Sequence, residues 1–337
     1  MLNELDVNIL DFPPSEFQYD IFHFTKYGEG NAVVIATAGS GKTTTILSAI
    51  KFVDESLKCL FVAFNKAIVN ELKERAPKRN KLLITTLHSL GYSILIAYSK
   101  SNKNNTFNIS FDEYKYVNYL RKNIHILSNE VEDALRKDKK FKLKNFIDEI
   151  IILYNLTRCY IAEDKEEIEK IAEKHGILIS YDMVDIILKL MNWGKENIKT
   201  IDFGDMIWLP NKKVLNITPV NKYDFIFLDE AQDLNRAQID LFLMCLSDKG
   251  RFCAVGDNNQ LIYGFTGNDE ETFERLKSIP NTKILPLSIS YRCCKAVVKE
   301  AQRIVPSIRS TENAIEGKEK RDVSISEIQE GDMDLCR

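Results

Sequence analysis

The sequence of 337 residues has no long apolar run, and no segment reaches the roughly 18 apolar residues of a membrane-spanning helix. Its first residues, MLNELDVNILDF, show no basic segment ahead of an apolar one, so no secretory signal is expected. The seven cysteines form no CxxC pair and no Cys/His group with zinc spacing. These absences predict an intracellular protein with free, reduced thiols and no membrane partner.

An excess of positive charge is also missing. Lysine and arginine number 46 against 49 acidic residues, which gives a formal net charge of −3. Any nucleic-acid binding must therefore come from a local group of cations and aromatic rings. The composition, 45% hydrophobic and 28% charged, is ordinary for a soluble globular protein, and the length allows two or three domains.

Short apolar runs rich in Val, Ile and Phe recur between helical patterns. Near-continuous apolar strands that alternate with amphipathic helices are typical of a parallel sheet covered on both faces. The sequence thus predicts an α/β fold. The predicted strands are Asn31–Ala36, Cys59–Phe64, Leu82–Thr86, Tyr223–Leu228, Arg251–Val255 and Lys283–Leu287.

A glycine-rich loop, ATAGSGKT at residues 36–43, follows the first of these strands and precedes a helix predicted from about 41 to 53. Its glycines let the backbone wrap closely around phosphate, although the first glycine of the general pattern is replaced by Ala36. Lys42 is suited to the β- and γ-phosphates and the Thr43 hydroxyl to Mg²⁺. Such a turn can be purely structural, but GSGKT between strand and helix favours phosphate binding. The predicted nucleotide contacts are Ala38, Gly39, Ser40, Gly41, Lys42, Thr43 and Thr44.

A pair of acids, Asp229 and Glu230, follows the apolar run FIFL. A carboxylate at the end of a buried strand beside a phosphate loop is placed to coordinate Mg²⁺, which we assign to Asp229. Glu230 is then placed to polarise the attacking water as general base. A solvated turn would also carry two acids, but the order of both motifs on one chain favours ATP hydrolysis.

The two motifs together resemble superfamily 1 DNA helicases of the UvrD/Rep type, in the branch of the F-box DNA helicase and its phage relatives. This resemblance implies a RecA-like P-loop sheet and a function in moving along DNA. It assigns Gln18, in FPPSEFQYDIF, to adenine recognition, and it assigns Gln260, in GDNNQLIYGF, to sensing the γ-phosphate. In SYR it implies that Tyr291 stacks near the adenine and that Arg292 reaches the γ-phosphate across a cleft.

Further motifs resemble the DNA-contacting segments of the same family. VAFNKAI corresponds to one such segment and TTLHSLG to another, while DFGDM at 202–206 resembles the DFxDL element. Lysine neutralises phosphate, the polar residues hydrogen-bond to it, and aromatic rings stack on bases. Each residue alone could equally belong to the core or the surface. The implied DNA contacts are Phe64, Asn65, Lys66, Thr86, His88, Tyr263 and Phe265.

The same resemblance, together with the change from strand patterns to charged helical stretches near residue 100, predicts the domain organisation. Residues 1–100 and 201–288 would form one RecA-like domain, interrupted by a helical insertion at 101–200 with helices at 131–144 and 162–174. Residues 289–337 would begin a second RecA-like domain. The family's motifs V and VI are not found, so we expect the chain to stop within that second domain and to have weak activity alone.

The predicted function is an ATP-dependent DNA helicase motor that uses ATP and Mg²⁺, binds single-stranded DNA or a single/double-strand junction, and moves 3′ to 5′ as the resemblance implies. One alternative is a nucleotide-dependent module that binds single strands or a protein without translocating. Another is the motor part of a helicase–nuclease. A protein or a missing C-terminal motor domain is a further expected partner. The basic stretch at 136–144 could contact DNA, but an acidic neighbouring helix slightly favours a solvated face.

Overall fold

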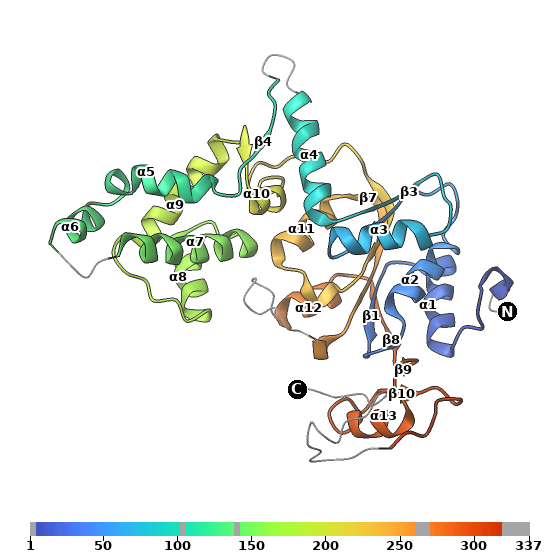
Figure 1. The fold of residues 1–337 in the computed structure, drawn as a ribbon. Coiled ribbons are helices and arrows are strands. Elements are labelled where there is room, and N and C mark those ends of the chain that lie inside the picture. The colour runs from blue at the N-terminus through green and yellow to red at the C-terminus, as the bar shows by residue number, and fades with distance from the viewer. Residues whose placement is uncertain (1–4, 102–105, 138–141, 261–269, 319–337) are drawn as a thin grey trace.

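The computed structural model describes residues 5–101, 106–137, 142–260 and 270–318. At its centre lies a six-stranded sheet of order β3-β2-β6-β7-β1-β8 in which every neighbouring pair is parallel (Figure 1). The α/β class and the parallel sheet are thereby confirmed. Its strands are β1 (Asn31–Ala36), β2 (Cys59–Val62), β3 (Leu82–Thr85), β6 (Tyr223–Leu228), β7 (Leu246–Gly256) and β8 (Thr282–Leu287). Most lie within two residues of their predicted bounds, but β7 begins at Leu246 rather than Arg251.

Alternating residues of the strands enter two separate cores. Val34 and Phe61 face one side of the sheet, while Val33 and Leu60 face the other. Both faces are buried, which is why the strands read as continuous apolar runs. The first face is covered by α1 (Glu16–Tyr27), α2 (Lys42–Ile50) and α3 (Lys66–Arg75). The second is covered by α4 (Leu87–Ser101), α10 (Phe203–Trp208), α11 (Arg236–Met244) and α12 (Glu270–Lys277).

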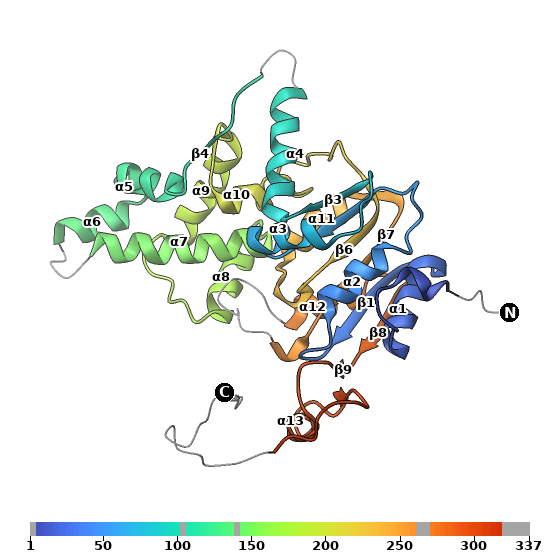
Figure 2. The ribbon, with the colours of Figure 1, turned by 45° about the vertical axis from the view of Figure 1, so that its right-hand side comes forward.

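A group of helices projects to one side of the second face, and we call it the helical lobe (Figures 1 and 2). Its elements are α5 (Lys115–Leu127), α6 (Asn129–Lys137), α7 (Leu143–Tyr160), α8 (Lys165–Lys174) and α9 (Met183–Glu196). The apolar core of this lobe is continuous with the core under the second face of the sheet. The single helix predicted at 131–144 is wrong, because α6 ends at Lys137 and Lys142 is the N-cap of α7.

Side-chain caps fix where the helices near the sheet edge begin. Ser15 with Gln18, Asp202 with Asp205, and Asn235 with Gln238 each form a reciprocal capping box at the start of α1, α10 and α11. Each box satisfies two backbone amides that the helix leaves unpaired.

Helix α10 also packs against α4 with its backbone, since a Cβ at Gly91 would overlap the carbonyl oxygen of Met206. Glycine at 91 therefore allows the residues 202–206 to lie directly on α4.

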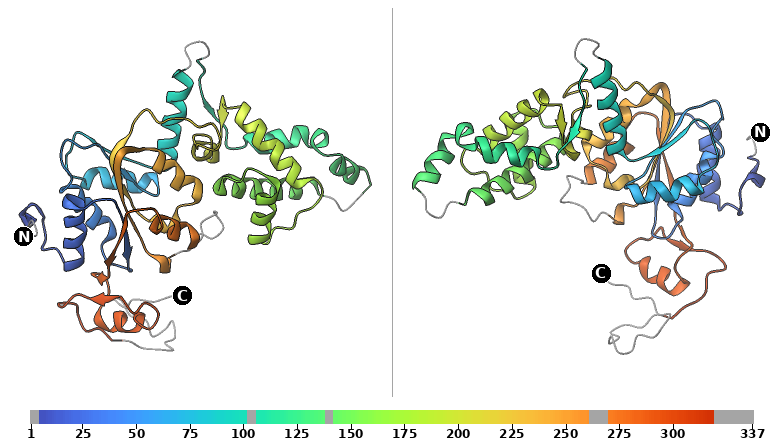
Figure 3. Two further views of the ribbon diagram at one scale, coloured as in Figure 1. Left: turned by 180° about the vertical axis from the view of Figure 1, so that it is seen from behind. Right: turned by 45° about the horizontal axis from the view of Figure 1, so that its top comes forward.

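The remaining elements are short. β4 (Ser110–Phe111) pairs in parallel with β5 (Thr200–Ile201), and β9 (Ile289–Ser290) pairs with β10 (Arg309–Ser310) beside α13 (Lys295–Ala301), in the unit at the lower end of the views in Figure 3. Single 3-10 turns are η1 (Val7–Ile9), η2 (Ala231–Asp233) and η3 (Asn258–Gln260).

Among the described residues no helix combines the length and apolarity that crossing a bilayer would need. Six described cysteines are free, of which Cys59, Cys245 and Cys253 are buried.

Candidate nucleotide and nucleic-acid site

The predicted site residues gather at one edge of the sheet. Because all six strands are parallel, their carboxyl ends meet at a single edge, where ligands of such folds bind. The glycine-rich loop leaves β1 there, the acidic pair leaves β6, and Asp257 follows β7. The segments after β2, β3 and β8 join the same edge.

The glycine-rich loop takes the backbone form that only glycine adopts easily. Gly39 and Gly41 have φ of 72° and 75°, and α2 begins directly afterwards at Lys42. A Cβ at Gly39 would also come within 2.7 Å of Ser290 Oγ and 2.8 Å of Arg292 Cβ. Any other residue at 39 would therefore strain the loop and push away the segment after β8.

Lysine and threonine of this loop are paired with the two acids after β6. Lys42 Nζ lies 2.7 Å from Glu230 Oε2, and Thr43 Oγ1 donates to Asp229 Oδ2 at 2.8 Å. The hydroxyl and carboxylate offer only oxygen donors, which is the donor set that Mg²⁺ prefers, so these residues fit that ion. Glu230 has a left-handed backbone with φ of 50°, which is uncommon outside glycine and typical of functional turns.

Burial changes the acidity of this cluster. Burial, with the charge of Glu230 adding to it, raises the pKa of Asp229, and the hydrogen bond from Thr43 opposes the rise. Burial and then Glu230 raise the pKa of Asp233 to about 6, against an opposing effect of Lys42. The cluster thus concentrates negative charge that a cation, such as the lysine or a metal ion, stabilises.

Gln18 and Tyr291 meet beside the loop, although 273 positions separate them in the chain. The Tyr291 hydroxyl donates to Gln18 Oε1 at 3.2 Å, and Gln18 Nε2 donates to Thr45 Oγ1 at 3.1 Å. The backbone amide of Tyr291 also donates to the Gly39 carbonyl at 2.9 Å. Gln18 is buried and caps α1 as well, so an adenine would have to replace some of these bonds.

Other predicted nucleotide contacts lie around the loop in different ways. Ala38 and Thr44 are exposed, and Arg75 Nη2 donates to Thr44 Oγ1 at 3.2 Å. Ser40 is buried, and its backbone amide donates to the Thr37 carbonyl at 3.2 Å, so a phosphate would have to replace that bond. The Arg292 side chain is exposed next to Gly39.

Gln232 connects the acidic pair to the segment after β7, and the sequence analysis missed it. Its Nε2 donates to Glu230 Oε2 at 2.8 Å, and its Oε1 accepts the Asp257 amide at 3.0 Å. A Cβ at Gly256 would come within 2.6 Å of the same Oε1, so glycine there makes room for the link. Its place in DEAQD, two residues after the proposed base, was the only signal in the sequence.

The link continues towards Gln260. Asp257 is buried, and its Oδ2 accepts Gln260 Nε2 at 2.8 Å while its carbonyl accepts the Gln260 amide at 3.1 Å. A chain of hydrogen bonds thus joins Glu230 through Gln232 and Asp257 to Gln260. Tyr263 and Phe265, the predicted stacking pair, lie outside the described residues.

The predicted DNA contacts after β2 lie at the surface, whereas Thr86 and His88 after β3 are half-buried. Phe64 is 48% exposed, and Asn65 and Lys66 beside it are also exposed. Asn65 caps α3 through its Oδ1, and Thr86 accepts the Ser89 amide at 3.2 Å, so both residues also support helix starts.

Three rings from distant parts of the chain form what we call the aromatic cluster: His88, Phe111 and Phe203. The Phe203 ring lies 4.6 Å from that of Phe111 and 6.1 Å from that of His88, in edge contacts. Phe203 is 52% exposed, so its ring is available to a ligand. Burial lowers the pKa of His88, which favours the neutral form of the ring.

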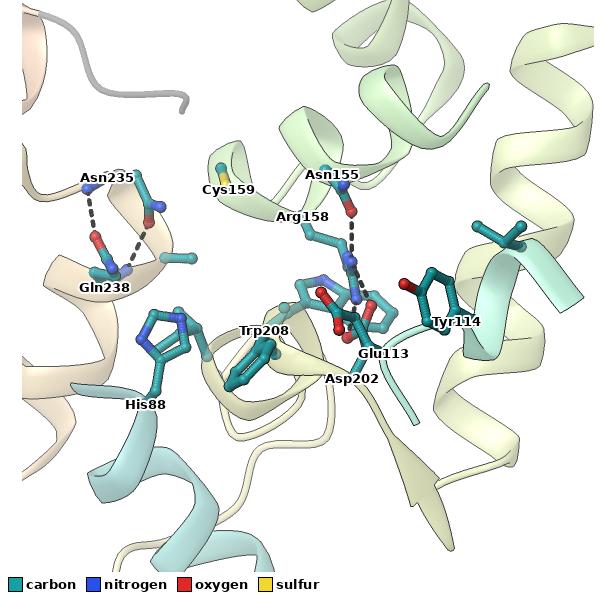
Figure 4. Close-up of a pocket in the computed structure, with 15 residues that line it drawn as sticks. His88, Glu113, Tyr114, Asn155, Arg158, Cys159, Asp202, Trp208, Asn235 and Gln238 are labelled. Atoms are coloured by element: carbon teal, nitrogen blue, oxygen red, sulfur yellow. Dashed lines mark hydrogen bonds and ion pairs between the residues drawn. The ribbon is translucent and has the colours of Figure 1, made fainter. Parts of the chain in front are cut away.

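A cavity of about 390 Å³ lies beside the cluster, between α4, α7, α10 and α11 (Figure 4). Aromatic and amide side chains line it, including Phe203, Trp208, Asn155 and Gln238. Figure 4 shows His88 on one side and the bonded group of Asn155, Arg158 and Asp202 on the other. Charged side chains line the cavity as well, namely Glu113, Arg158 and Asp202.

A phosphate loop after one strand of a parallel sheet, facing an acidic pair after another, defines a P-loop nucleotide-binding protein. Residues 20–280 match the family model described as the UvrD/REP helicase N-terminal domain. Since this match covers most of the chain, the protein belongs to the UvrD/REP helicase family.

Named relatives agree with this family. The chain is 28% identical over 294 residues to the ATP-dependent DNA helicase Rep of Buchnera aphidicola subsp. Acyrthosiphon pisum, across 82% of this chain and 43% of that protein. It is 26% identical to Rep of Escherichia coli K12, across 82% and 41%. It is 27% identical to PcrA of Staphylococcus aureus Mu50, across 83% and 38%. The chain therefore spans less than half the length of these relatives.

Proposed function

We propose that this chain is the N-terminal motor region of an ATP-dependent DNA helicase, which couples ATP binding and hydrolysis to its grip on single-stranded DNA. The observation that carries the proposal is the hydrogen-bonded path along the sheet edge from Lys42 and Glu230 through Gln232 to Asp257 and Gln260. Hydrogen-bond networks of this kind can carry coupling between sites, and in the sequence this path leads from the ATP-binding residues towards Tyr263 and Phe265, which follow Gln260.

On the nucleotide side, Lys42 binds the terminal phosphates, while Thr43 and Asp229 would hold Mg²⁺, which would neutralise phosphate charge. Lys42 Nζ lies 2.7 Å from Glu230 Oε2. The negatively charged triphosphate therefore competes with Glu230 for this lysine. When Lys42 turns to phosphate, the Glu230 carboxylate becomes available to accept the proton of an attacking water. Binding of ATP thus prepares the base for hydrolysis.

The residues after β8 recognise the adenine and close the site. Tyr291 lies against Gln18 and the loop, so an adenine that enters there meets an aromatic face and an amide. Arg292 is exposed beside Gly39, and its guanidinium stabilises the charge that develops on the γ-phosphate.

On the DNA side, the exposed Phe64 and the aromatic cluster offer stacking faces, and Lys66 neutralises phosphate. Thr86 and His88 add hydrogen bonds to the backbone of the strand. We assign single-stranded DNA as the ligand, with a single/double-strand junction bound near the helical lobe and movement 3′ to 5′. These finer assignments rest on the family resemblance.

ATP hydrolysis measured with and without oligo(dT) tests the proposal. We expect turnover that the oligonucleotide increases, and we expect Lys42→Ala and Glu230→Gln to abolish it. Lys51→Ala is the matched control, because Lys51 ends the same helix but bonds Asp11 and the Ile9 carbonyl away from the loop. Turnover that survives Lys42→Ala would contradict the nucleotide site, and failure to bind oligo(dT) would contradict the DNA assignment.

A further inference from the structure

Four charged side chains are buried where the helical lobe meets α10, away from the nucleotide site. Lys115 comes from α5, Arg158 from α7, and Asp202 and Asp205 from the capping box of α10. Their side chains are only 2%, 5%, 12% and 0% exposed. Two cations face two carboxylates, so the group is electrically balanced, as buried charges must be.

Both carboxylates are fully engaged. Arg158 holds Asp202 with both ends of its guanidinium, Nη1 to Oδ1 at 2.7 Å and Nη2 to Oδ2 at 2.8 Å. Asp205 accepts Lys115 at 2.7 Å, the Tyr116 hydroxyl at 2.7 Å and Arg158 at 3.1 Å. A two-pronged pair of this kind fixes the orientation of both partners, which a lysine at 158 could not do.

The Arg158 guanidinium is packed between two aromatic rings and the backbone of Gly204. It lies over the rings of Tyr116, 4.9 Å from the centroid, and Tyr154, at 4.5 Å. On its other side is Gly204, where a Cβ would overlap the guanidinium carbon. Glycine at 204 thus allows the turn to lie directly on the arginine.

Phe203 lies in the chain between Asp202 and Asp205, the two carboxylates that bond Arg158. Gly204, which follows it, packs against the guanidinium. The Phe203 ring itself contacts the aromatic cluster and is 52% exposed. The turn that carries this ring is therefore bonded to a cation of the helical lobe.

We propose that Arg158 is a positioning residue for single-stranded DNA: it holds residues 202–205 so that Phe203 presents its ring to a base. The helical lobe thereby contributes to DNA binding through a side chain that acts by holding Phe203 in place. This inference rests on the proposed function and adds a residue to it, because Arg158 lies in no motif that the sequence analysis singled out. Lys115 supports the same turn from α5.

The test is a double-mutant cycle on the affinity for fluorescein-labelled oligo(dT), measured by anisotropy. Loss of one stacking contact weakens single-strand binding about 5- to 150-fold. We expect Phe203→Ala to fall in that range and Arg158→Lys, which keeps the charge but loses the two-pronged bond, to weaken binding about tenfold or less. If Arg158 acts through Phe203, the double variant binds no more weakly than Phe203→Ala alone.

Gly204→Ala is a second variant that tests the role of Arg158, because the added methyl group displaces the guanidinium without removing a charge. It should reproduce the loss of Arg158→Lys. Arg79→Lys is the matched control, since Arg79 also bonds partly buried groups, the carbonyls of Val53 and Leu57, but at the far side of the sheet. It should lower the melting temperature and leave the DNA affinity unchanged. Affinity for a fluorescent ATP analogue should be unchanged in all four single variants.

Wild-type DNA affinity in Arg158→Lys and Gly204→Ala would overturn the inference, even if both variants melt earlier. Losses from Arg158→Lys and Phe203→Ala that multiply in the double variant would overturn it as well, because the two residues would then act independently. If the wild-type chain does not bind oligo(dT) at all, the proposed function itself fails and the inference falls with it.

Discussion

Replacement of Gln232 by leucine probes the connection between the nucleotide and DNA sides. The glutamine is 2% exposed and bridges the Glu230 carboxylate and the Asp257 amide. Leucine has a similar size but offers neither a donor nor an acceptor, so both bonds are lost together. The Asp257 amide would then be buried without a partner.

The expected cost follows from these two bonds. A buried amide left unpaired costs about 1–3 kcal/mol, and the bond to Glu230 adds about 1 kcal/mol because that side chain is 30% exposed. The free energy of unfolding should fall by about 2–4 kcal/mol, which lowers the melting temperature by several degrees. In addition, the change in DNA affinity caused by ATP, about 5- to 150-fold for a typical coupled pair of sites, should fall towards one.

The assay compares oligo(dT) affinity with and without a non-hydrolysable ATP analogue and Mg²⁺, at a temperature where the variant is folded. Gln302→Leu is the control, because Gln302 also donates from Nε2, to the Ile308 carbonyl, but in the unit beside α13. The control should keep the full effect of the analogue. A Gln232→Leu protein that melts earlier yet retains the wild-type effect would refute the connection and leave Gln232 a purely structural residue.

Three further changes test individual parts of the site. Glu230→Gln removes the charge that holds Lys42, so the ATP analogue should bind about three- to tenfold more tightly in a titration, while hydrolysis falls about a hundredfold or more with the loss of the base. Unchanged ATP affinity would show that the ion pair does not compete with the triphosphate. Gly39→Ala places a Cβ against Ser290 in a left-handed backbone, and should cost about 1–3 kcal/mol in urea unfolding and weaken ATP binding; a variant as stable as wild type would contradict the loop geometry. Asp233 has its pKa raised from 3.8 to about 6, so the folded state holds the extra proton more tightly and stability falls as pH rises between these values. Asp233→Asn should abolish that fall and be the more stable protein above pH 6 in thermal melts, and an unchanged pH profile would contradict the assignment.

The sequence predicted the parts of the site that are local in the chain. The strands 31–36 and 223–228 are found with the predicted bounds, since apolar runs next to GSGKT and DEAQD carry their own signal. Position 39 also has to be glycine for a local reason, its positive φ, which the motif already implies.

Parts that depend on distant segments were not predictable in the same way. The aromatic cluster brings together His88, Phe111 and Phe203 from three elements, and only the fold makes them neighbours. The bidentate bond of Arg158 to Asp202 spans 44 positions and has no local pattern. Nothing in the sequence distinguishes Arg158 from an arginine on a solvated helix face.

Hydrogen–deuterium exchange of the whole chain tests the central claim most directly, because it reports where each ligand binds. With Mg²⁺ and the ATP analogue, the account predicts slower exchange of the loop amides at 37–46 and after β6. With oligo(dT), it predicts slower exchange at 64–68, 86–91 and 202–206. Protection by either ligand at the opposite edge of the sheet, or the absence of protection at these segments when binding is saturated, would contradict the account.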